Sequence, residues 1–331
     1  MTEVTLTEAE SGPVLSNGTL TVTVHLNRGT FSVVDETTGR AAIADAAVAV
    51  LLSPGLSFSS RGAGFESEGA APIDDALGRG ISLLLRRDGD EHEPALLLTI
   101  ALYDGYPFVV TQAELLNTGP AKMQILAFHV LDSARLDLGS PPSSWRFYKH
   151  GWQSWSPTLV LDCSGGDVLL ASPVIAPHTE PEARDGRFVS ELMTAIASPE
   201  TGHGLVAGFI TTADQFSQLW LDREPQTLAA ASYADGVAVP PGGSLASERL
   251  FLEPTTAPLE AMERYGDALG RAMETTPPEQ IATGWCSWYQ FWQGVKEEHI
   301  IANLEELTRR RHDLPFEYVQ IDDGYQAEIG D

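Results

Sequence analysis

The chain of 331 residues carries 46 acidic and 20 basic side chains, for a formal net charge of −26, and 43% of its residues are hydrophobic. This composition allows packed cores, and the length is typical of about two domains. The negative charge argues against nucleic acid and anionic lipid as partners, because both select basic patches. We therefore expect neither a nucleic-acid-binding nor a membrane-binding protein.

The N-terminus shows no targeting signal. Residues 1–8 contain no basic region and no apolar run, so they do not resemble a secretory signal peptide. The weakly polar stretch 41–52 contains Asp45 and is too short to cross a bilayer. Cys163 and Cys286 are the only cysteines, which suits a reducing compartment. We expect a cytoplasmic protein in which Cys286 is a small buried apolar residue.

Residues 1–257 predict an antiparallel β-sandwich. Many short apolar or alternating segments are separated by turn-forming residues, and no helical pattern intervenes. The predicted strands are Thr19–Leu26, Phe31–Asp35, Ile81–Leu85, Ala95–Tyr103, Phe108–Leu116, Gln124–Val130, Leu192–Ala197, Leu205–Phe209 and Phe216–Leu221. The segment 62–80 is rich in Gly and Ala, and we expect it to be a long surface loop.

One helix is predicted after these strands. Pro258 is favourable in a first turn, and Pro277 and Pro278 end the pattern. The apolar positions with helical spacing are Leu259, Met262, Tyr265, Leu269 and Met273. Residues 258–281 are therefore assigned to a linking helix and linker.

Residues 282–331 have the pattern of one strand-helix-strand unit. The aromatic block 285–289 precedes a helical segment that begins near Glu297, and the strand-like run 318–326 follows. Such a unit closes right-handed and parallel, so Trp288 and Asp323 should lie at the same, C-terminal, end of neighbouring strands. In a parallel α/β barrel, this end binds substrates.

Two sequence blocks resemble glycoside hydrolase family 36 (GH36), the α-galactosidases. One comprises Gly284 to Tyr289 together with Gln320 to Gln326, and the other is Gly151 to Pro157. The resemblance implies a mostly β protein, in which a large antiparallel β-sandwich is followed by a linking helix and a (β/α)8 barrel. The second block resembles the loop that the family's sandwich sends over the barrel mouth.

Only the first strand, helix and second strand of the implied barrel match. A complete barrel takes at least about 200 residues, so residues 282–331 resemble the start of a truncated one. In the family, the nucleophilic and acid/base aspartates lie on later strands, beyond Asp331. The sequence therefore assigns no catalytic residue, and we expect the chain by itself to be inactive.

The resemblance implies five substrate-binding residues: Asp322, Asp323, Trp288, Trp155 and Tyr289. Carboxylates accept hydrogen bonds from sugar hydroxyls, and aromatic faces cover sugar C–H patches. In the family, the tandem aspartates hold the 4- and 6-hydroxyls of galactose, the two tryptophans lie at the galactose pocket, and Tyr289 is a weaker candidate. A turn in which Asp322 or Asp323 bonds its own backbone is the competing structural interpretation.

Strand alternation bears on these roles. Adjacent strand residues point to opposite faces, so Asp322 and Asp323 do not flank one glycosidic bond at the roughly 5–5.5 Å of a retaining pair. They are expected to hold substrate. Alternation also predicts that Trp288 and Cys286 share one face of the strand, whereas Tyr289 lies on the opposite face. Lys149 and His150, before the sandwich loop, are expected to be solvated turn residues.

No metal or cofactor is expected. The histidines show no close pairing at ligand spacing, no Cys-x-x-Cys occurs, and glycoside hydrolysis needs carboxylates alone. The sequence predicts the N-terminal part of a retaining α-galactosidase that acts on raffinose- or melibiose-type oligosaccharides. For the full-length form, a homo-oligomer is one of the possible states. The alternatives are a galactosyltransferase of the raffinose-synthase type and a non-catalytic carbohydrate-binding fragment.

Overall fold

The computed structural model describes residues 2–90, 92–151, 156–168 and 184–328. The chain divides into two compact units, Met1–Thr275 and Thr276–Asp331, called here the sandwich unit and the C-terminal unit. The division falls inside the predicted linker, and the linking helix belongs to the sandwich unit.

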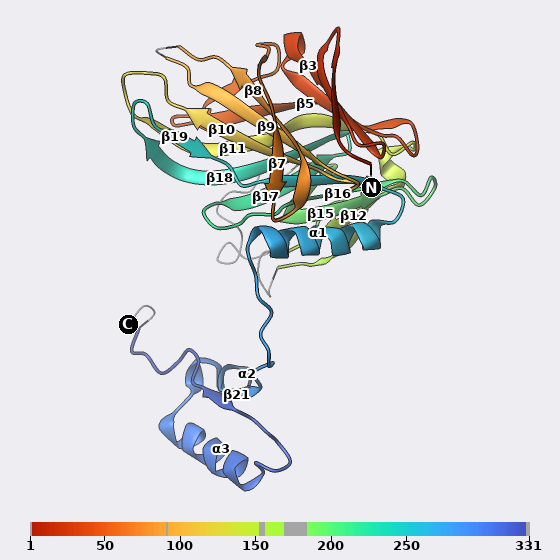
Figure 1. Ribbon diagram of the computed structural model, residues 1–331. Coiled ribbons are helices and arrows are strands. Elements are labelled where there is room, and N and C mark those ends of the chain that lie inside the picture. The colour runs from red at the N-terminus through yellow and green to blue at the C-terminus, as the bar shows by residue number, and fades with distance from the viewer. Residues whose placement is uncertain (1, 91, 152–155, 169–183, 329–331) are drawn as a thin grey trace. The chain divides into compact units, whose positions relative to one another are not determined.

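Two antiparallel sheets build the sandwich unit (Figure 1). The first sheet has the order β1-β2-β3-β4-β5-β11-β18-β17-β14, with β6 paired to β5. Its strands are β1 (Thr5–Ala9), β2 (Gly12–Ser16), β3 (Leu20–His25), β4 (Thr30–Asp35), β5 (Arg40–Leu52), β6 (Leu56–Ser59), β11 (Met123–Leu136), β14 (Arg187–Glu191), β17 (Phe216–Asp222) and β18 (Thr227–Val239). Two 3-10 turns, η1 (Leu26–Arg28) and η2 (Pro142–Ser144), interrupt the strand succession.

The second sheet has the order β13-β12-β15-β16-β20-β10-β9-β8-β7, with β19 paired to β10. Its strands are β7 (Glu66–Asp75), β8 (Gly78–Arg87), β9 (Ala95–Tyr103), β10 (Val109–Leu116), β12 (Arg146–Lys149), β13 (Leu159–Asp162), β15 (Met193–Ala197), β16 (Gly204–Phe209), β19 (Ser244–Ala246) and β20 (Leu250–Thr255). Together the sheets confirm the predicted antiparallel sandwich.

The main core lies between the sheets. Phe31 and Phe128 from the first sheet and Ile100 and Phe147 from the second are fully buried in one cluster. Alternation explains the arrangement, because residues two apart on a strand share a face. In β3, Leu20, Val22 and Val24 are buried, whereas the residues between them are half-exposed. Every strand predicted from such patterns is present.

One part of the sandwich differs from the sequence-based expectation, and one long strand had not been predicted. The predicted surface loop 62–80 contains β7, which pairs along its length with β8. Nearly every β7 residue is exposed because the strand lies at the sheet edge, so it lacks the apolar alternation that marks a half-buried strand. The alanine-rich stretch 41–52 is part of the thirteen-residue strand β5, which pairs with β4 and β11.

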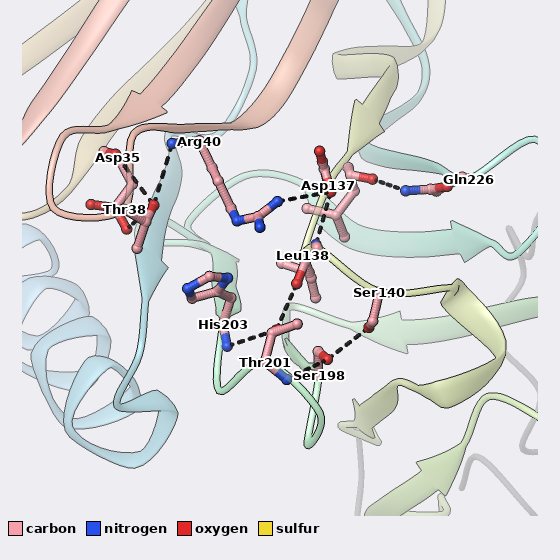
Figure 2. A network of polar contacts seen from close by, with 12 residues as sticks. Asp35, Thr38, Arg40, Asp137, Leu138, Ser140, Ser198, Thr201, His203 and Gln226 are labelled. Carbon is pink, nitrogen blue, oxygen red and sulfur yellow. Dashed lines mark hydrogen bonds and ion pairs between the residues drawn. The ribbon is translucent and has the colours of Figure 1, made fainter.

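Polar contacts join the two sheets at one end (Figure 2). Thr201, in the turn between β15 and β16, donates a 2.7 Å hydrogen bond to the Leu138 carbonyl just after β11. The Ser140 and Ser198 hydroxyls lie 2.7 Å apart. Because β11 and β15 belong to different sheets, these bonds hold the sheet ends together. His203 lies in the same connection between β15 and β16.

Helix α1 (Pro258–Ala272) covers the outer face of the second sheet (Figure 1). Its buried residues are Ala261, Tyr265 and Ala268, and the Tyr265 hydroxyl donates a 2.7 Å hydrogen bond to the Phe209 carbonyl. Small residues allow this close contact, and Leu259 of the predicted apolar stripe is instead 78% exposed. Pro258 occupies the first turn as predicted.

The C-terminal unit is one parallel β-α-β unit. Strand β21 (Gly284–Cys286) pairs with β22 (Tyr318–Gln320), and α3 (Glu297–Arg309) connects them. Two short helical turns, α2 (Trp288–Phe291) and η3 (Trp292–Gly294), lie between β21 and α3. The strand-helix-strand prediction is confirmed, although each strand has only three residues.

Candidate substrate site at the ends of β21 and β22

The parallel pairing brings two motifs to one end of the small sheet. Cys286 and Gln320 are aligned as the last residues of the two strands. Trp288 follows the first strand, and Asp322 and Asp323 follow the second. The prediction that Trp288 and Asp323 lie at the same, C-terminal, end is therefore confirmed.

Neighbouring groups orient the Asp322 carboxylate. The Cys286 thiol donates to Asp322 Oδ2 at 3.2 Å, and Gln320 Nε2 donates to the same oxygen at 3.0 Å. Oδ1 accepts the Asp323 backbone N–H at 2.8 Å. These hydrogen bonds, that of the Asp323 N–H foremost, lower the pKa of the Asp322 carboxyl. Asp322 is thus an ionised, oriented hydrogen-bond acceptor.

A buried hydroxyl holds the Asp322 backbone. Ser287 is fully buried, and its Oγ accepts the Asp322 backbone N–H at 2.9 Å. The Ser287 N–H in turn donates to the Gln320 carbonyl at 3.1 Å. Ser287 therefore extends the pairing of the two strands beyond their ends and sets where the aspartate loop begins.

Asp323 lies in a turn, where strand alternation does not apply. Gln326 Nε2 donates to Asp323 Oδ1 at 3.0 Å, and Gln326 Oε1 accepts the Gly324 N–H at 2.8 Å. Gly324 has φ +106°, and a Cβ there would lie 2.7 Å from Gln293 Cα, so the turn requires glycine. The premise that Asp322 and Asp323 are adjacent strand residues is therefore wrong, because β22 ends at Gln320. The competing turn interpretation describes the backbone correctly, while Asp323 remains exposed.

The aromatic residues also leave the strand earlier than predicted. The chain bends into α2 because the N–H groups of Gln290 and Phe291 both donate to the Ser287 carbonyl, at 3.3 and 3.0 Å. Alternation accordingly fails for Trp288 and Tyr289. The Trp288 ring lies 5.0 Å from that of Trp292, and Tyr289 is 85% exposed. Trp292 has φ +52°, an uncommon conformation for a bulky residue.

The second sequence block, Gly151 to Pro157, belongs to the sandwich unit, and only part of it lies within the described residues. Trp155 lies outside the described residues. Lys149 is buried and pairs with Asp167 at 3.0 Å, which corrects its expected solvation. His150 is half-buried, and its Nδ1 lies 3.1 Å from the Glu191 carbonyl.

Sequence reasoning missed the residues that position Asp322. Cys286 was expected to be inert packing, yet it is half-buried and donates to the carboxylate. Ser287 carries no sequence signal, since its role depends on a residue 35 positions away. The contact of Trp288 with Trp292 had no helical signal either, because Trp292 follows the end of α2 and has φ +52°.

The described residues show neither a metal site nor a membrane-spanning helix. They contain no group of three or more His, Cys, Asp or Glu side chains that could hold a metal ion. No helix in the described part of the chain is both long and apolar enough to cross a bilayer.

No family model matches this chain. Solved structures do resemble it. The α-galactosidase from Lactobacillus brevis has a TM-score of 0.53 at 11% identity, over 99% of this chain and 49% of that one. The galactosidase domain of the α-galactosidase-sucrose kinase AgaSK gives 0.57 at 10% identity, over 99% and 52%. A substituted GH36 α-galactosidase AgaA from Geobacillus stearothermophilus, in complex with raffinose, gives 0.50 at 13%, over 88% and 40%.

This chain thus spans about half the length of the first α-galactosidases it matches. At these identities the likeness establishes a shared fold. The protein has the architecture of GH36 α-galactosidases in their N-terminal β-sandwich portion.

Proposed function

We propose that this chain forms the N-terminal part of a retaining α-galactosidase of the GH36 type, which removes terminal α-D-galactosyl residues from oligosaccharides. The observation that carries the proposal is the placement of two aspartates and a tryptophan at the C-terminal ends of adjacent parallel strands. Parallel α/β barrels bind their substrates at this end. The shared fold with α-galactosidases supports the same assignment.

Asp322 and Asp323 accept hydrogen bonds from the galactosyl hydroxyls in this proposal. Both are carboxylates at an accessible strand end, and the pKa of Asp322 is lowered, which favours the ionised acceptor. Trp288 offers an aromatic face for the sugar C–H groups, and Tyr289 lies at the exposed margin. Trp155 is proposed to approach the same sugar from the sandwich loop.

The two aspartates do not act as the catalytic pair. Asp322 Oδ1 bonds the backbone N–H of Asp323 within one turn, whereas a retaining pair needs two carboxyls on opposite sides of the glycosidic bond. The nucleophile and the acid/base are therefore proposed to come from other strands of the full-length protein. The substrates are α-galactosides of the raffinose or melibiose type, and the raffinose complex of AgaA supports this class.

Substitution of Asp323 in the full-length protein tests the proposal. Asp323→Ala removes a charge-assisted hydrogen bond worth about 1.5–3 kcal/mol, so kcat/KM for an aryl α-galactoside should fall roughly 10- to 150-fold. Asp313→Ala, in the loop after α3, is the matched control and should leave kcat/KM unchanged. Unchanged kinetics of Asp323→Ala would refute the assignment. Product analysis with sucrose as acceptor separates hydrolysis from galactosyl transfer.

A further inference from the structure

A pocket lies on the sandwich unit where the chain passes between the two sheets. Its volume is about 360 Å³, within the range of roughly 300–1,000 Å³ that is typical of small-molecule sites. The lining residues used below are His150, Glu191, Leu192, Asp214, Gln215 and Phe216. They come from the ends of β12 and β14 and from the loop that leads into β17.

The carboxylate of Glu191 lies in one wall of the pocket and is held in place by neighbouring side chains. Glu191 is 7% exposed, and its Oε1 accepts a 2.8 Å hydrogen bond from Gln218 Nε2. The Tyr233 hydroxyl donates to Gln218 Oε1 at 2.9 Å, which fixes the orientation of the amide. Glu191 is therefore positioned before any ligand arrives.

The facing loop is equally constrained. The buried carboxylate of Glu248 accepts the backbone N–H groups of Asp214 and Gln215 at 2.8 and 3.0 Å. Ser232 Oγ donates to Gln215 Oε1 at 2.6 Å. These contacts bind the backbone of the loop and leave the exposed side chain of Asp214 on the pocket wall.

His150 contributes a further acceptor. Its Nδ1 lies 3.1 Å from the Glu191 carbonyl, which only accepts, so Nδ1 carries the proton. In the uncharged tautomer with its proton on Nδ1, Nε2 has a lone pair that can accept a hydrogen bond. Next to it, Leu192 has φ +61°, an uncommon backbone conformation that occurs preferentially where surrounding structure holds a site in place.

The lining chemistry selects one ligand class. Among the described residues, no arginine or lysine lines the pocket, which disfavours anions, and no group of three metal-ligating side chains exists. The side chains offer acceptors in His150, Glu191 and Asp214 and an aromatic surface in Phe216, which is 36% exposed. Hydroxyl groups need acceptors, and sugar C–H faces pack on aromatic rings. We propose that this pocket of the sandwich unit binds a neutral saccharide.

Titration of the 331-residue chain with raffinose tests this proposal. Ligand-observed NMR and calorimetry should detect binding at up to about 10 mM sugar. Phe216→Ala removes the aromatic surface and should weaken binding about 3- to 10-fold, and Asp214→Asn should weaken it as well. Both side chains are exposed, so the fold should persist. Phe316→Ala, which removes an exposed phenylalanine from the C-terminal unit, is the matched control and should bind normally.

Asp323→Ala in the same chain separates this pocket from the candidate substrate site. Raffinose binding that survives Asp323→Ala and weakens in Phe216→Ala supports the pocket, whatever the full-length protein catalyses. Binding lost in Asp323→Ala and kept in both pocket variants would overturn the proposal. No binding over the whole titration would overturn it too.

Discussion

The sandwich unit and the C-terminal unit contain similar apolar residue types but bury them to very different extents. In the sandwich, long central strands pair on both sides, and one continuous core lies between the sheets. In the described part of the C-terminal unit, Val295 and Ile300 are the only buried hydrophobic residues. Larger side chains there, such as Tyr318 and Ile321, are 60% and 49% exposed.

The difference shows that a β-α-β pattern defines local structure without supplying a core. Parallel strands normally have both faces covered by other elements. Strand β22 is exposed at all three of its residues. An antiparallel sandwich instead closes its two inner faces on each other, so its stability is contained within the unit.

Hydrogen exchange should show the largest contrast. Amides of the central strands β11 and β18 exchange only through near-global opening, whereas those of β22 open locally. We expect protection of the central strands to exceed that of β22 by at least about 1,000-fold. Equal protection of both units in a monomer would show that the C-terminal unit has a core of its own.

Truncation of a buried tryptophan should come next in size. Trp145 is fully buried, and its Nε1 donates to Ser140 Oγ at 3.0 Å. Trp145→Ala should lower the free energy of unfolding by about 3–5 kcal/mol, measured by chemical denaturation. Tyr289→Ala, in the C-terminal unit, should change it by less than about 0.5 kcal/mol. A small effect at Trp145 would mean that this end of the sandwich repacks.

Acid should weaken the sandwich through His129. Burial lowers the pKa of His129 below its ordinary value of 6.5, with Asp132 nearby opposing the shift and the Trp220 ring at its edge. The unfolded chain therefore takes up the proton first, so the stabilising contribution is complete above pH 6.5 and is lost as the pH falls through the lower folded pKa. His129→Gln should reduce the loss of Tm between neutral and acidic pH. The same slope in His129→Gln and wild type would exclude this origin, and exposed His312→Gln is the control.

Substitution of two glycines should give effects of opposite sign. A Cβ at Gly266 in α1 meets nothing within 4 Å, so Gly266→Ala should stabilise the sandwich unit by about 0.5–1 kcal/mol. A Cβ at Gly208 would lie 2.6 Å from the Tyr265 ring, so Gly208→Ala should loosen α1 and lower Tm. Equal Tm values for the two variants would show that α1 does not pack on the sheet as described.

Alternating apolar residues identified the sandwich strands whose two faces have different environments. β3 is an example, since its buried core residues alternate with half-exposed ones. The edge strand β7 escaped detection because an exposed strand has no inner face to mark it. The helical stripe of α1 was located correctly, but its contact residues include alanines whose use depends on the close approach of the sheet.

The sequence by itself determined the fold class, the order of the strands that have apolar patterns, the two longer helices and the positions of the two motifs, because spacing and turn residues act locally. Tertiary structure decided what those motifs do in space. Ser287 and Cys286 orient Asp322 only because β21 pairs with β22, across a separation of 35 and 36 residues respectively. The bend of Trp288 into α2 and the turn at Gly324 depend likewise on hydrogen bonds and contacts beyond the strand ends. After the ends of β21 and β22, the direction of each side chain depends on partners that are distant in the chain. Residue alternation along a strand cannot predict it.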